Sequence, residues 1–126
     1  MSAVTKIQEV LATGLLIPQL TIIPSRGALD EEIRQEEVLL RRRLCFDHVA
    51  ILRCWNGIAL DVVRLFGCGE NASNVGRISS SQIKNCVGIE GAITIGSDAA
   101  GFVYLQTCDG HVWVLDSDGG KVEQLA

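Results

Sequence analysis

The C-terminal third of the chain carries the clearest pattern, AITIGSDAAGFVYLQTCDGHVWVLDSDGGKVEQL over residues 92–125. Runs of β-branched, aliphatic and aromatic residues alternate there with short polar breaks, as is typical of strands joined by tight turns. Asp109-Gly110 forms one break, and glycine tolerates the positive φ that two-residue hairpin turns need. The pattern therefore predicts an antiparallel meander. Its strands are expected at residues 92–95, 102–107, 111–115 and 122–125.

Helical spacing of apolar residues precedes the meander. It predicts helices over residues 2–13, 29–42 and 46–55, the first ending at Gly14 and the last at Asn56-Gly57. Further local patterns predict a strand over residues 58–66 that ends before Gly67. They also predict a short strand over residues 20–23 and a helical turn over residues 79–85. Helices first and strands afterwards predict an α+β fold, with N-terminal helices packed against a mostly antiparallel, twisted sheet of about four to six strands.

Length and hydropathy limit the class of protein. The 126 residues suit one domain, residues 1–126, although 48% are hydrophobic and the mean hydropathy is +0.28. The longest apolar stretch, residues 14–23, is interrupted by Pro18 and Gln19, so it falls short of the roughly 20 residues of a membrane span. The first dozen residues do not resemble a signal peptide. We therefore expect a soluble, cytoplasmic protein that does not interact with membranes.

Charge limits the kinds of partner the chain can bind, and cysteine content indicates the state of its thiols. The net charge is −4, and residues 87–126 hold six acidic side chains against Lys121 alone. An acidic domain without clustered cations is not expected to bind nucleic acid directly, although Arg41, Arg42 and Arg43 form a basic helix end. The five cysteines include no Cys-x-x-Cys pair, so we expect reduced, mostly buried thiols.

Candidate catalytic and metal-binding patterns are weak. The glycine-rich segment at residues 67–72 lacks the βαβ context of a dinucleotide site, and Asp116 and Asp118 lack the distal glutamate of a calcium loop. Two Cys-x-x-His pairs, at residues 45–48 and 108–111, would form a zinc site only if the fold brought them together. No thiol has a recognisable histidine base. The sequence predicts no cofactor, no metal and no enzymatic activity, with a Cys/His hydrolase as the least favoured alternative.

The order of these features resembles the SUKH superfamily, which includes the yeast Smi/Knr cell-wall regulators and bacterial immunity proteins. The resemblance spans about residues 20–126. It rests on ALDEEIRQEEVLL, on DHVAILRCWNG with its Asn56-Gly57 stop, on IALDVVRLFGCG, and on Ile95-Gly96-Ser97-Asp98 before a strand, an Asp-Gly turn and another strand. It implies a non-catalytic immunity protein that binds and neutralises a cognate toxin domain, of which a nuclease is one candidate. A regulatory interaction scaffold of the Smi/Knr type is the alternative.

The negative charge of the C-terminal third would suit the binding of a toxin domain. Toxin nucleases are usually basic where they hold nucleic acid, so a negative face would speed and orient association. Aspartate at turns is also expected for backbone reasons alone. Members of the family tend to continue into a C-terminal helix, and the last element expected here is a strand, so an uncovered sheet edge could support self-association. The residues predicted to contribute to the negative face are Glu90, Asp98, Asp109, Asp116 and Asp118.

Overall fold

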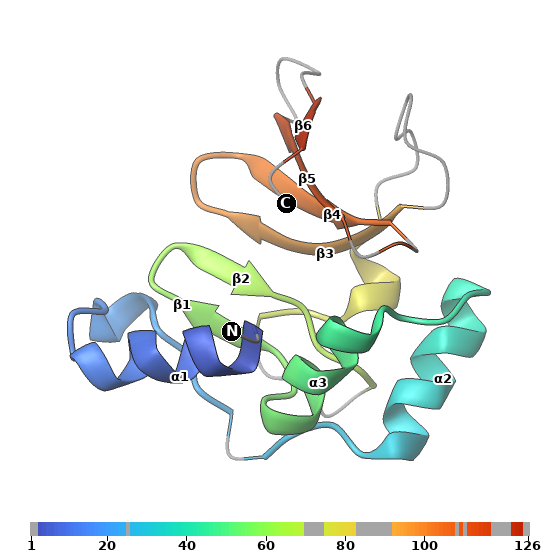
Figure 1. Ribbon diagram of the computed structural model, residues 1–126, viewed down its shortest axis with the longest axis horizontal. Helices are drawn as coiled ribbons and strands as arrows, with labels where there is room; N and C mark the ends of the chain where they lie inside the picture. Colours follow the sequence, from blue (N-terminus) through green and yellow to red (C-terminus); the bar gives the residue numbers. More distant parts are fainter. Residues whose placement is uncertain are drawn as a thin grey trace.

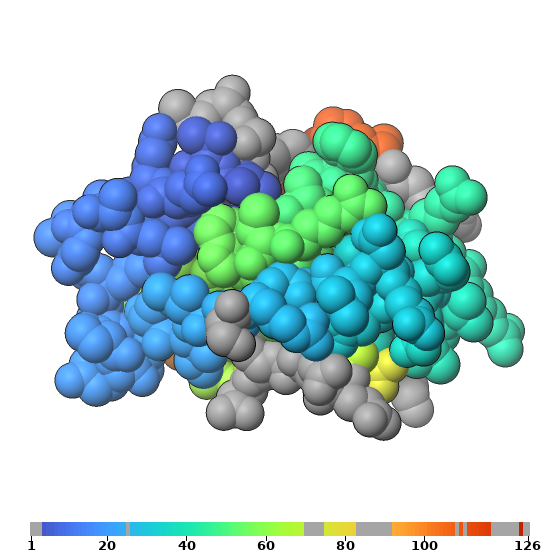
Figure 2. Space-filling view, turned by 90° about the horizontal axis from the view of Figure 1, so that it is seen from below, coloured from blue at the N-terminus to red at the C-terminus, as the bar shows by residue number. Residues whose placement is uncertain are grey.

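A computed structural model describes most of the chain and confirms the predicted α+β class. The described residues are 3–24, 26–69, 75–82, 92–107, 109, 111–116 and 122–124. Three helices come first, α1 (Ala3–Thr13), α2 (Asp30–Leu40) and α3 (Phe46–Cys54), close to the predicted ranges. Figure 2 shows them side by side, with α3 between α1 and α2. None of the helices in the described ranges is long and apolar enough to cross a lipid bilayer.

Among the described residues, six strands form one antiparallel sheet in sequence order. They are β1 (Ile58–Leu60), β2 (Val63–Leu65), β3 (Ile93–Asp98), β4 (Phe102–Gln106), β5 (Val112–Asp116) and β6 (Val122–Gln124). Each strand pairs with the next, as predicted for the C-terminal meander. The sheet twists so that β6 stands far from the helices, which lie beneath β1, β2 and β3 (Figure 1).

Two predictions of local structure are wrong. Residues 58–66 do not form one strand, because the chain reverses at Asp61, whose φ of 59° is left-handed, and β1 pairs with β2 as a hairpin. Residues 20–23 form no strand; the 3-10 helix Pro18–Leu20 precedes a single bridge between Ile22 and Ala59. The turn predicted at 79–85 is a 3-10 helix at Ile78–Ser80, and residues 83–85 lie outside the described residues.

The core lies between the helices and the sheet. Ile33 of α2 and Leu52 of α3 belong to one buried cluster with Ile93 and Ile95 of β3, and Leu40 of α2 packs against this cluster, which explains the apolar spacing of both helices. The buried members of this cluster are Ala28, Ile33, Leu44, Leu52, Phe66, Cys68, Ile78, Ile93 and Ile95.

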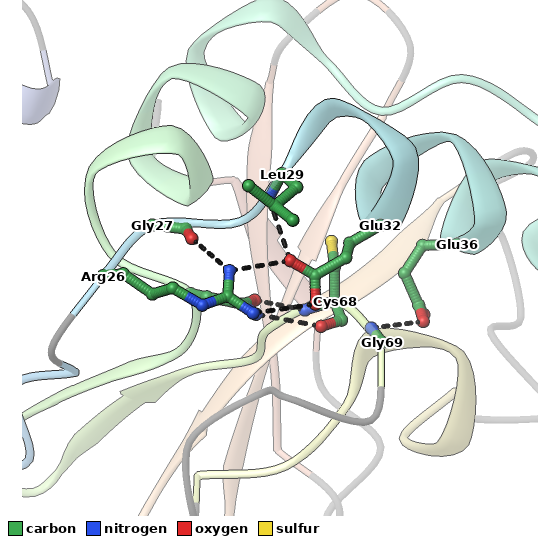
Figure 3. Close-up of polar contacts among 8 residues, drawn as sticks. Arg26, Gly27, Leu29, Glu32, Glu36, Cys68 and Gly69 are labelled. Carbon is green, nitrogen blue, oxygen red and sulfur yellow. Dashed lines mark hydrogen bonds and ion pairs between the residues drawn. The ribbon is translucent and has the colours of Figure 1, made fainter.

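Two glutamates on the inner side of α2 fix the helix, Glu32 to the segment just before it and Glu36 to loops far away in sequence. Glu32 accepts hydrogen bonds from the Leu29 N–H (2.9 Å) and from the Arg26 guanidinium (2.8 and 3.3 Å), while Glu36 accepts from the Gly69 N–H (2.9 Å) (Figure 3). Both carboxylates are buried, and Glu36 has no exposed surface. Because the carboxylates are well supplied with donors, they serve as structural anchors of α2.

A second buried polar contact explains the Asn56-Gly57 stop. The Asn56 side chain donates to the Cys68 carbonyl oxygen (3.0 Å) and accepts from the Cys68 N–H (2.6 Å). Gly57 adopts a φ of 84°, which releases the chain from α3 into β1. The turn after α3 is therefore fixed by side-chain bonds as well as by glycine.

Candidate protein-binding surface

The predicted acidic residues do not form one face. In an antiparallel meander, successive turns lie at opposite ends of the sheet. Asp98 ends β3 and Asp116 ends β5 at one end, with Phe102 of β4 between them in the strand register, whereas Asp109 lies at the other end. The ends of the five-residue β4 are roughly 13 Å apart at about 3.3 Å per residue. Glu90 and Asp118 lie outside the described residues.

Asp98 is built into the β3–β4 turn. Its Oδ1 accepts hydrogen bonds from the N–H groups of Ala100 (2.9 Å) and Phe102 (3.1 Å), and its Oδ2 accepts from the Tyr104 hydroxyl (2.8 Å). Desolvation raises the pKa of Asp98, but the Tyr104 hydroxyl and the two N–H groups outweigh it and hold the pKa below its ordinary value. Asp98 therefore keeps a fixed negative charge at neutral pH.

Asp109 has a similar turn-forming role at the opposite end. Its Oδ1 accepts from the Thr107 hydroxyl and from the His111 N–H (3.2 Å), and these two bonds lower its pKa. The side chain is 64% exposed, and Oδ2 lies 3.7 Å from His111 Nε2. Asp109 thus presents a charge to solvent, but away from Asp98 and Asp116.

The end that holds Asp98 and Asp116 also holds Asp61, which the sequence did not single out. The β1–β2 turn and the β3–β4 turn lie at this end, beside the segment that follows α1 (Figure 1). Val63 pairs with Asp98 in the sheet register, which brings the turn at Asp61 next to the end of β3. We call this region, defined by Asp61, Asp98 and Asp116, the acidic end.

A cleft of about 340 Å³ opens at the acidic end. Its walls are joined by hydrogen bonds, because the Asp61 N–H donates to Thr21 Oγ1 (3.3 Å), and Ile22 and Ala59 exchange backbone bonds of 2.9 and 3.0 Å. The cleft is therefore formed without a ligand. Its lining combines aliphatic, acidic and basic side chains: Gln19, Leu20, Ile22, Asp61, Val62, Arg64, Ser97, Asp98 and Ala99.

The two Cys-x-x-His pairs do not assemble into a described metal site. Cys45 Sγ donates to the Thr107 carbonyl oxygen (2.9 Å), so the first pair does approach the β4–β5 turn. The His48 ring, however, is buried and has no hydrogen-bond partner, whereas the His111 ring contacts Gln124 (2.9 Å) and is half-exposed. Within the described ranges, no three metal-binding side chains converge; Cys108 lies outside those ranges.

The described thiols differ in environment. Cys68 is buried, and desolvation together with nearby Glu36 and Glu32 raises its pKa to about 12. Cys45 is partly buried and Cys54 is exposed, so the prediction of mostly buried thiols is wrong for Cys54. None of these three forms a disulfide with another described residue, and the remaining two cysteines lie outside the described residues.

Comparison with known proteins adds no assignment. No protein-family model matches the chain, and no curated protein shows significant similarity to it. The resemblance to the SUKH superfamily thus remains a prediction that depends on the order of elements and the quoted residues.

Proposed function

We propose that the chain is an immunity protein that binds and neutralises a cognate toxin domain through the acidic end, without chemistry of its own. One observation carries the proposal: two carboxylates from separate turns, Asp61 and Asp98, line a preformed cleft, and a third, Asp116, ends β5 at the same end of the sheet. The toxin as partner comes from the resemblance to the SUKH superfamily.

The electrostatics of the acidic end suit a cationic partner. Arg64 is the one basic residue in the cleft lining, and it forms no ion pair with another described residue. Fixed carboxylates of one sign raise association rates with a basic surface and disfavour acidic partners. A toxin nuclease, whose substrate site must attract phosphate, presents such a surface.

The test begins with co-purification of the chain with the product of the adjacent gene, followed by measurement of toxin activity in the complex. A stable complex with inhibited toxin is the expected result. Absence of a complex contradicts the proposal, and a complex with an active toxin favours the scaffold alternative instead.

Charge reversal then locates the binding surface. Asp116→Lys should slow association roughly tenfold at low ionic strength, an effect that disappears at high salt because exposed charges are screened. Two variants of the same charge change are the controls, Asp109→Lys at the opposite end and Glu9→Lys on exposed α1. Equal slowing by all three variants would mean that net charge, and not the acidic end, governs association.

A further inference from the structure

Large apolar side chains are exposed at the acidic end and in the segments next to it. Leu20 and Val62, each 44% exposed, line the cleft itself. Leu15 (85%) and Ile17 (44%) belong to the same segment after α1, and Phe102 (37%) lies in the row between Asp98 and Asp116. Single exposed apolar residues are ordinary, but a group of them around one cleft marks an interaction site.

The cleft also holds an unmatched carboxylate oxygen. Asp61 Oδ1 is shielded from solvent and has no hydrogen-bond partner among the described residues. The nearby Arg64 does not pair with it, and the Asp98 carboxylate is occupied by its own turn and by Tyr104. A carboxylate oxygen without a donor leaves the negative charge of Asp61 uncompensated, so a cation entering the cleft would be attracted to this carboxylate.

We propose that the cleft receives an apolar side chain of the partner protein together with an adjacent lysine or arginine. The apolar side chain would contact Leu20 and Val62, and the cation would lie beside the Asp61 carboxylate. This inference rests on the proposed function for the kind of partner and names the chemistry of its anchoring residues.

Charge excludes two other occupants. In a two-fold contact with a second copy, the same patch faces itself, so Asp61 and Asp98 would meet their own like charges. An anionic lipid surface would likewise be repelled by the carboxylates. A hydrophobic segment with a cation is complementary to both the aliphatic and the acidic residues that line the cleft.

Amide chemical-shift titration of the isotopically labelled full chain tests the inference with two matched peptides, acetyl-Leu-Lys-Leu-amide and acetyl-Leu-Glu-Leu-amide. The lysine peptide, added to about 10 mM, should bind with a Kd in the millimolar range and shift the amides of residues 19–22, 61–64 and 97–99. The glutamate peptide should shift them at least about threefold less. Shifts of equal size with both peptides, shifts elsewhere, or no shifts would overturn the inference.

Three variants assign the effect to side chains. Asp61→Asn keeps a residue that tolerates the left-handed φ of 59° and should remove the preference for lysine over glutamate. Val62→Ser should weaken binding of the lysine peptide at least about threefold, whereas Val38→Ser, which alters a 71% exposed valine on α2, should leave it unchanged. Equal weakening by Val62→Ser and Val38→Ser would overturn the assignment to the cleft.

The same spectra distinguish this inference from self-association and from the proposed function. Shifts of these amides on dilution, without peptide, would show a second copy in the cleft and overturn the inference. The peptide result does not depend on a toxin: a lysine-selective cleft in a chain that binds no toxin contradicts the proposed function alone. If the toxin binds without shifting the amides of the cleft residues, the inference about the cleft fails and the proposed function does not.

Discussion

Replacement of Glu36 by glutamine should destabilise the fold strongly, although the two side chains have nearly the same shape. The Glu36 carboxylate is fully buried and accepts from the N–H groups of Gly69 (2.9 Å) and Ser79 (2.8 Å) and from Arg77 Nε. Glutamine supplies one oxygen and an NH₂ group, which cannot accept a hydrogen bond. At least one of the backbone N–H groups is then left facing a donor.

The magnitude follows from the three donors. An unsatisfied buried N–H costs about 1–3 kcal/mol, and loss of a charge-assisted bond to Arg77 adds to it. The Arg77 side chain is 28% exposed and can reach water, so this addition is smaller than for a fully buried pair. We expect a loss of about 3 kcal/mol in the free energy of unfolding, a large share of the roughly 5–15 kcal/mol typical of a domain.

Urea unfolding followed by circular dichroism measures the effect, with Glu31→Gln on the exposed side of α2 as the control. The control should change the free energy of unfolding by less than about 0.5 kcal/mol. If Glu36→Gln costs less than about 1 kcal/mol with an unchanged m-value, the carboxylate does not anchor α2 and the reasoning fails.

The pH dependence gives a second readout of the same carboxylate. Desolvation raises the pKa of Glu36, but the Gly69 N–H, Arg77 and Ser79 together lower it below its ordinary 4.5. Because the folded-state pKa lies below the unfolded one, the contribution is complete above pH 4.5 and is lost as pH falls through the folded-state pKa. Wild type should lose stability over this range, and Glu36→Gln should lose less.

Three further predictions concern other parts of the molecule. Burial lowers the pKa of His48 from 6.5 to about 4, so between these pH values the unfolded chain binds a proton that the folded chain does not. The free energy of unfolding should therefore fall by about 3 kcal/mol from pH 6.5 to pH 4. In a series of urea denaturations at different pH, His48→Leu should flatten this part of the curve. Gly27→Ala would place a Cβ 1.7 Å from the Arg53 carbonyl oxygen, so thermal unfolding should show a loss of more than about 2 kcal/mol, and an unchanged Tm would contradict this contact. Thiol-reagent labelling of the native protein at neutral pH should modify exposed Cys54 rapidly and buried Cys68, whose pKa is about 12, only on unfolding.

The helices and the C-terminal meander could be predicted because their signals are local. The spacing of Ile33 and Leu40 identifies the inner side of α2. Gly14 directly follows α1 and Gly57 lies in the turn after α3, both in left-handed conformations, with φ of 67° and 84°. Neighbouring strands of the meander pair with each other, so the order along the sequence is the order in the sheet. These features need no knowledge of distant contacts.

The β1–β2 hairpin could not be predicted in the same way. The apolar run over residues 58–66 fits a single buried strand, and its one acidic residue, Asp61, is followed by Val62, which is uncommon in tight turns. The turn forms because the flanking strands gain tertiary partners: the segment at Ile22 bridges to Ala59, and β3 pairs with β2. Tertiary pairing thus overrides a local pattern that favours continuous strand.

Glu32 and Glu36 were also missed as structural residues. The partners of Glu36 are distant in sequence, whereas Arg26 and Leu29, which donate to Glu32, lie just before α2. In the sequence they read as the acidic first half of an amphipathic helix, where carboxylates are expected to face solvent and favour the helix dipole. Only the fold brings the N–H groups of Gly69 and Ser79 against the buried side of α2. A glutamate at an apolar position of the helical repeat is the one local signal, and Glu36, three residues after buried Ile33, has it.

Acidic residues that lie close together in the C-terminal third of the sequence lie far apart in the folded meander. Asp98 and Asp109 lie close along the chain, but alternate turns place them at opposite ends of the sheet, so they cannot both contact one small partner segment. Asp61 lies far from both in sequence and yet joins Asp98 in one cleft, because Val63 pairs with Asp98. Charge reversal at Asp116 and Asp109 therefore compares two ends that the sequence treats as one, and a larger effect of Asp109→Lys on association would move the binding surface to the β4–β5 turn.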